Sequence, residues 1–138
     1  MIGILIVAHG SLADSLVECA THVLGQRPSG LATLDFKGHA DPDERQKALQ
    51  TRLDELDEGN GILVLTDVYG ATPSNTLCRV LEPARVEAIT GVNLPMLLKA
   101  LNYRDSLPLP QLIERIVEGG RNSINHISET MCHAATGR

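Results

Sequence analysis

Residues 2–10 of the chain read IGILIVAHG, an apolar run that ends in a histidine and a glycine. A continuous apolar run of this length is typical of a strand in a parallel sheet whose two faces are both covered by helices. Ser11 follows, with Asp14 three residues later, and this pair predicts a capping box at the start of a helix. Apolar residues then recur at helical spacing until Gly25. The beginning of the chain therefore predicts a strand, a turn and a helix.

The same alternation of strand and helix signals continues along the chain. Three further apolar segments predict strands, at residues 31–36, 62–65 and 85–90. Helix starts follow these strands, marked by caps, turns or first-turn prolines at Asp41-Pro42, 70–75, Asn93 and Pro108-Leu109-Pro110. The pattern predicts an α/β fold, a single-domain three-layer sandwich around a mainly parallel, doubly wound sheet of four strands with right-handed crossovers.

The ends of several elements are also predicted. The helix after residue 75 is expected to include Leu77, Val80 and Leu81, and the last helix is expected to stop at Gly119-Gly120. Residues 123–127 are interpreted as a short C-terminal edge strand. The domain is expected to span residues 1–128, with residues 129–138 as a flexible tail.

Composition limits the classes of function. Of the 138 residues, 43% are hydrophobic, which fits one compact core, and 2% are aromatic, which disfavours stacking on bases or sugars. The net charge is −5 and the 12 basic residues are scattered, so binding of nucleic acid is not expected. The apolar run at residues 2–8 is too short for a membrane span or a signal peptide, so no membrane insertion is expected.

Cysteine usage indicates a cytoplasmic protein. Cys19, Cys78 and Cys132 are odd in number and match no metal-ligand spacing, so we interpret them as reduced, mostly buried thiols. No metal and no cofactor are predicted.

Two polar clusters follow predicted strands. His9 ends the first strand, and Thr66-Asp67 ends the third, with a glycine-containing turn just beyond it. Ligands of open α/β sheets bind at the carboxyl ends of the strands, where the strand order reverses. If these two strands are neighbours, His9 and Asp67 face one crevice.

This pair suits phosphoryl transfer. Imidazole is a good nucleophile near neutral pH, and a carboxylate bonded to one ring nitrogen would leave the other nitrogen free to attack. We therefore expect His9 to be the nucleophile and Asp67 to orient it. Backbone N–H groups in two turns are expected to hold the phosphoryl oxygens; the residues concerned are Gly10, Ser11, Gly70, Ala71 and Thr72.

Three motifs carry a resemblance to a known family. They are the strand and histidine at residues 2–10, TDVYGATPSN at 66–75 and GVNLPML at 91–97. In this order and over nearly residues 1–125, they resemble the mannose-type enzyme IIA components of the bacterial sugar phosphotransferase system. The chain has Ala71-Thr72 where the family often has Gly-Ser, and Thr72 keeps the hydroxyl group.

The resemblance implies that His9 takes a phosphoryl group on Nε2 from the histidine phosphocarrier protein, while Asp67 hydrogen-bonds the ring. The group would then pass to a separate IIB component or serve regulation. The resemblance also implies a homodimer in which the strand at residues 123–127 exchanges between subunits.

Two other functions compete with this interpretation. Small chelatases that insert a metal into a tetrapyrrole also begin with a strand ending in a His-Gly-Ser sequence, but they need a second histidine in the cleft. None occurs between His39 and His126, and both of these, like His22, are expected to be solvated. A non-catalytic regulatory module of the same fold is disfavoured because His9 and Asp67 are both intact.

Overall fold

A parallel sheet of four strands forms the centre of the molecule. The structure, a computed structural model, describes residues 1–37, 41–68 and 76–136. The strands are β1 (Gly3–Val7), β2 (Leu31–Leu34), β3 (Ile62–Thr66) and β4 (Val86–Thr90), and their order across the sheet is β2-β1-β3-β4. Every pairing is parallel, and Val7 lies opposite Leu34 on one side and Thr66 on the other. The predicted α/β fold with a four-stranded parallel sheet is confirmed.

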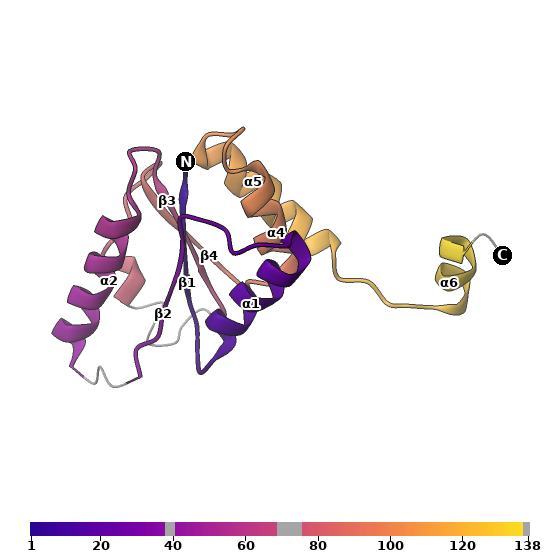
Figure 1. Cartoon of the computed structure of the whole chain (residues 1–138), viewed down its shortest axis with the longest axis horizontal. Helices are drawn as coiled ribbons and strands as arrows, with labels where there is room; N and C mark the ends of the chain where they lie inside the picture. Colours follow the sequence, from indigo (N-terminus) through magenta and orange to yellow (C-terminus); the bar gives the residue numbers. More distant parts are fainter. Residues whose placement is uncertain (38–40, 69–75, 137–138) are drawn as a thin grey trace.

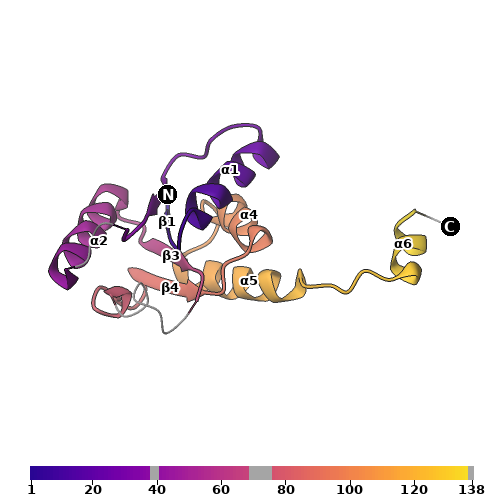
Figure 2. The same ribbon diagram turned by 90° about the horizontal axis from the view of Figure 1, so that it is seen from below.

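Helices cover both faces of the sheet. α1 (Leu12–Leu24), α4 (Leu94–Tyr103) and α5 (Leu109–Asn122) lie on one face, and α2 (Pro42–Leu56) lies on the other, as Figures 1 and 2 show. α6 (Glu129–Thr136) follows an extended segment and lies apart from the rest of the molecule (Figure 1). Among the described residues, no helix has both the length and the apolar character needed to cross a bilayer.

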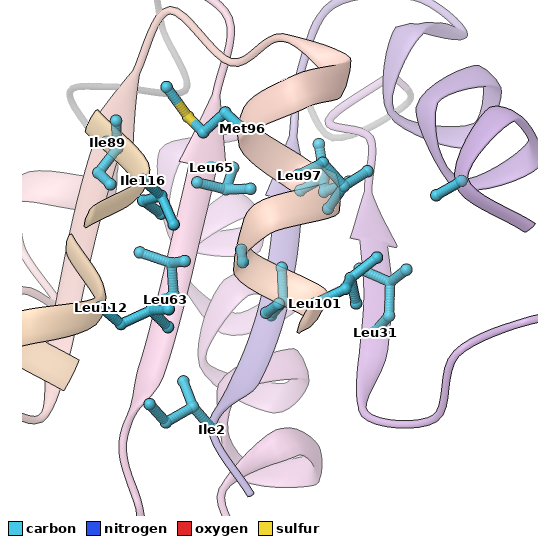
Figure 3. Packing of buried hydrophobic residues seen from close by; sticks show 14 of the residues in the cluster. Ile2, Leu31, Leu63, Leu65, Ile89, Met96, Leu97, Leu101, Leu112 and Ile116 are labelled. Atoms are coloured by element: carbon cyan, nitrogen blue, oxygen red, sulfur yellow. The ribbon is translucent and has the colours of Figure 1, made fainter. Parts of the chain in front are cut away.

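Alternation along β1 divides the interior into two cores. Ile4 and Ile6 pack with α1, α4 and α5, whereas Leu5 and Val7 pack with α2. Figure 3 shows the larger core, in which side chains of β1–β4 meet those of the helices; labelled there are Ile2, Leu31, Leu63, Leu65, Ile89, Met96, Leu97, Leu101, Leu112 and Ile116. Because both faces of β1 are buried, its sequence is apolar without interruption.

Two of the three predicted side-chain caps are formed. Asp41 caps α2 by accepting the Asp43 N–H at 2.9 Å, and Asn93 caps α4 by accepting the Met96 N–H at 2.9 Å. The prediction of a capping box at the start of α1 was wrong, because the side chain of Ser11 makes no capping hydrogen bond. Its partner Asp14 instead accepts the hydroxyl hydrogen of Thr33 on β2, at 2.6 Å. A contact with the neighbouring strand therefore replaces the local one.

The predicted end of the last helix was wrong. α5 continues through Gly119 and Gly120 to Asn122, although glycine weakens a helix. A Cβ atom at Gly120 would lie 2.9 Å from Cε of Met96, and one at Gly119 would collide with the side chain of Lys99. These glycines let α5 pack closely against α4, so they serve the packing of two helices and do not end one.

The helix predicted after residue 75 ends earlier than expected. Residues 76–78 are helical and 79–80 form a turn, so Val80 and Leu81 lie outside the helix. Leu77 is buried in the smaller core, whereas Leu81 is exposed. The apolar spacing that suggested a longer helix thus includes Leu81, which lies outside the buried core.

The C-terminal edge strand is absent from a single chain. Residues 124–128 have no strand pairing, and the side chains of Ile124 and Ile127 are 79% and 71% exposed. A short strand needs a partner edge to be stable, and this segment leads away from the sheet toward α6 (Figures 1 and 2). The segment interpreted as a flexible tail contains the helix α6, and that interpretation allowed for some helix there.

The cysteines lie at the surface and not in the core. Cys19, Cys78 and Cys132 are all exposed. On α1 the inward face is made by Ala13, Val17 and Ala20, and Cys19 precedes the last of these on a different face. The prediction that these cysteines are mostly buried was therefore wrong.

Candidate functional site

His9 and Asp67 lie together at the carboxyl edge of the sheet. His9 follows β1 and Asp67 follows β3, and these strands are hydrogen-bonded neighbours. The strand order reverses at this place, because β1 is followed by β2 on one side and the chain later returns to β3 on the other. The predicted meeting of the two residues at the switch point is confirmed.

With the residues that the structure describes, the carboxylate of Asp67 makes three hydrogen bonds, two of them with His9. Its Oδ2 accepts the backbone N–H of His9 at 2.9 Å and lies 2.8 Å from the ring Nδ1. Its Oδ1 accepts the backbone N–H of Val68 at 2.8 Å. The side chain of Asp67 is 12% exposed and that of His9 is 59% exposed. A largely buried carboxylate thus holds an imidazole that faces solvent.

These hydrogen bonds keep Asp67 ionised. Partial burial acts to raise the pKa of Asp67, but the hydrogen bonds from the His9 backbone, the His9 ring and the Val68 backbone outweigh it. The pKa is therefore held below its ordinary value of 3.8. An ionised carboxylate only accepts hydrogen bonds, so Nδ1 must carry the hydrogen and the lone pair of the neutral ring lies on Nε2.

The backbone around Asp67 is held by the chain that follows β4. The carbonyl oxygen of Asp67 accepts the N–H of Gly91 at 3.0 Å, and that of Thr66 accepts the N–H of Val92 at 3.0 Å. The hydroxyl group of Thr90 also donates to the Asp67 carbonyl, at 3.4 Å. The sequence analysis did not predict these hydrogen bonds to the main chain of Asp67. The signal for them in the sequence is the motif GVN at residues 91–93.

The predicted phosphate-binding turns are described in part. Gly10 has φ of 55° and leads directly into α1, whose first residue Leu12 donates its N–H to the carbonyl of His9 at 3.2 Å. Gly70, Ala71 and Thr72 lie outside the described residues. Of the other histidines, His22 and His126 are exposed, as predicted, and His39 lies outside the described residues.

Fold and site together define a class of protein. It is an open parallel α/β domain that presents a solvent-facing imidazole, in contact with a carboxylate, at the switch point of its sheet. Such a site suits the acceptance of a small group from another molecule, since it lies at the surface.

Comparison with known proteins identifies the family. A family profile described as the PTS system fructose IIA component, EIIA-man, matches residues 3–117. The fructose-specific EIIA component of Bacillus subtilis is 31% identical over 130 residues, which cover 94% of this chain and 88% of the relative. The mannose-specific EIIAB component of Escherichia coli is 33% identical over 125 residues, covering 89% of this chain and 38% of the relative.

Solved structures agree with these matches. The phosphotransferase system component EIIA of Streptococcus agalactiae superimposes with a TM-score of 0.80 at 25% identity, covering 91% of this chain and 97% of the other. The chain belongs to the mannose-type EIIA family of the sugar phosphotransferase system. It is therefore a phosphoryl carrier and a phosphotransferase component of that system, and the chelatase and non-catalytic alternatives find no support.

Proposed function

We propose that this chain carries the phosphoryl group on Nε2 of His9, receiving it from the histidine phosphocarrier protein and passing it to a IIB component in the cytoplasm. The observation that carries the proposal is the 2.8 Å contact between Nδ1 of His9 and Oδ2 of Asp67. Because Asp67 is ionised and bonded to Nδ1, Nε2 keeps its lone pair. The high exposure of His9 lets a partner protein reach it.

The transfer step follows from this arrangement. The lone pair of Nε2 attacks phosphorus, and the bond between phosphorus and the nitrogen of the donor breaks as the new P–N bond forms. The hydrogen on Nδ1 stays in place, and the ring gains a positive charge that Asp67 stabilises. In the onward transfer, a residue of the IIB component attacks phosphorus, the bond between phosphorus and Nε2 breaks, and Nε2 regains its lone pair.

Two turns are proposed to hold the phosphoryl oxygens. Gly10 and Ser11 lie between His9 and the first turn of α1, where backbone N–H groups favour an anion. Gly70, Ala71 and Thr72 follow Asp67 in the sequence and are assigned the same role. Positioning and charge neutralisation are the main tasks of a protein that transfers a phosphoryl group.

A labelling experiment tests the proposal. Phosphoenolpyruvate, its kinase and the phosphocarrier protein are expected to add one phosphoryl group, which is labile in acid and stable in base. Intact-mass analysis and peptide mapping should place it on His9. His9→Ala should abolish labelling, whereas His22→Ala, which changes an exposed histidine of α1, should leave it unchanged. A label on a serine or threonine, or no label at all, would overturn the proposal.

The proposed carrier is a homodimer. A groove of about 470 Å³ runs between β4 and α5 and is lined mainly by apolar atoms, with Ala88, Ile113 and Val117 among its residues. β4 is the last strand of the sheet, and within the described chain its outer edge is met by no further strand, although Val86 at its start forms an isolated bridge with Glu82. The extended segment with exposed Ile124 and Ile127 fits such an edge in a second copy.

A further inference from the structure

The turn at residues 91–93 connects β4 to α4 and holds the main chain of Asp67. Gly91 donates its N–H to the carbonyl of Asp67, and Val92 donates its N–H to the carbonyl of Thr66, both at 3.0 Å. Gly91 has φ of 80°, which glycine adopts at low cost and which lets the chain turn at the end of β4. The main chain that carries the Asp67 carboxylate therefore cannot move independently of this turn.

Asn93 joins the turn to two helices at once. Its Oδ1 accepts the N–H of Met96 at 2.9 Å and so caps α4. Its Nδ2 donates to the carbonyl of Gly120 on α5 at 3.2 Å, although Gly120 lies 27 residues later in the sequence. A helix cap needs only the first of these bonds, so the second requires another explanation.

The attachment point on α5 is tightly packed. A Cβ atom at Gly120 would lie 2.9 Å from Cε of Met96 and 3.6 Å from Oδ1 of Asn93. The carbonyl of Gly120 also accepts the hydroxyl hydrogen of Ser123 at 2.6 Å. Because packed interiors resist small displacements, this carbonyl is a firm anchor for the side chain of Asn93.

We propose that Asn93 is a positioning residue for the His9–Asp67 pair, because its bond to Gly120 fixes the turn that holds the main chain of Asp67. This inference rests on the proposed phosphoryl transfer and deepens it. The contact between Asp67 and His9 is short, and displacements on the order of 1 Å are enough to impair catalysis. A turn released from α5 would let the carboxylate shift, and the ring of His9 would then sample both tautomers.

Two substitutions separate capping from positioning. Asn93→Ser keeps a hydroxyl oxygen that can cap the Met96 N–H but is too short to reach Gly120, whereas Asn93→Ala removes both bonds. We expect both variants to accept the phosphoryl group roughly two to thirty times more slowly, the range found for residues that act through others. Asn93→Ser should retain more of the wild-type stability in urea. In ¹⁵N spectra of the unphosphorylated protein, both should move the ring nitrogens of His9 toward a mixture of tautomers.

A control substitution at the other end of the strands shows what a loss of stability alone does to the rate. Asp57→Ala removes an acceptor of the Gly59 N–H and an ion pair with Arg85, and these residues precede β3 and β4, whereas the site lies at the carboxyl ends of the strands. It should lower stability and leave the rate and the His9 spectrum unchanged. Wild-type spectra and rates in both Asn93 variants, or an equal slowing in Asp57→Ala, would overturn the inference. A wild-type chain that takes no phosphoryl group would instead overturn the proposed function, and the tautomer spectra would still decide the role of Asn93.

Discussion

At the scale of residues, the site consists of two side chains with opposite exposures. Asp67 is largely buried and has a lowered pKa, whereas His9 is open to solvent. The types of these residues and their places after strands were enough to predict that they meet. The hydrogen bond from the His9 backbone to Asp67 was not predictable, since it depends on how the chain bends after β1. The side-chain and backbone bonds together explain why this carboxylate stays ionised.

Substitution of Asp67 by asparagine should change both the rate and the pH dependence of stability. The amide keeps the shape but not the charge, so phosphorylation should slow by roughly ten- to a thousand-fold. Because the pKa of Asp67 is lowered in the folded state, its ionisation stabilises the wild type above the ordinary value of 3.8, and this advantage is lost as the pH falls through the lower folded value. Urea unfolding of both proteins should show a difference that narrows between pH 7 and pH 3. A difference independent of pH would show that the charge of Asp67 does not stabilise the fold.

At the scale of elements, the strands and helix starts were predicted from local sequence signals. The predictions failed where a contact between residues far apart in the sequence determines the structure. Apolar runs and caps correctly predicted β1–β4 and the starts of α2 and α4. The continuation of α5 through Gly119-Gly120 depends on the approach of α4, which no local pattern records. The structural role of Arg104 was not predicted for the same reason, since its partners lie far away in the sequence. It is 6% exposed, and its guanidinium donates to the carbonyls of Ile2, Ser29 and Gly30.

Replacement of Arg104 by methionine should destabilise the fold without harming the site. Burial lowers the pKa of Arg104, while the charges of Asp105 and Glu58 act to raise it, and the three carbonyls it bonds would lose a charged donor. We expect the free energy of unfolding to fall by about 2–3 kcal/mol in urea titrations. Arg52→Met is the matched control, because Arg52 makes an exposed ion pair with Glu55, which should contribute less than about 0.5 kcal/mol. Equal losses in the two variants would mean that the buried bonds of Arg104 add nothing.

At the scale of the whole molecule, the site and the proposed dimer surface share a boundary. The groove between β4 and α5 is lined by Gly91 and Asn93 as well as by apolar residues, so a partner seated in it would cover the turn that holds Asp67. The edge strand at residues 123–127 was predicted from its sequence, and a single chain does not form it. Sequence patterns report which segments favour a strand, but whether a partner edge is available depends on assembly.

The last prediction concerns this assembly. Ile124 and Ile127 are the exposed apolar side chains of the extended segment, and a double substitution to serine removes the area they would bury against β4 and α5 of a second copy. We expect the wild type to sediment as a dimer at micromolar concentration and the double variant to dissociate at concentrations at least roughly ten-fold higher, since burying each such side chain contributes about 1.5–3 kcal/mol. Met131→Ser, which changes an exposed apolar residue of α6 beyond the segment, should leave the dimer intact. Because His9 and Asp67 both come from one chain, the dissociated variant should still accept the phosphoryl group. A wild type that sediments as a monomer, or a double variant that remains a dimer, would exclude this segment as the link between subunits.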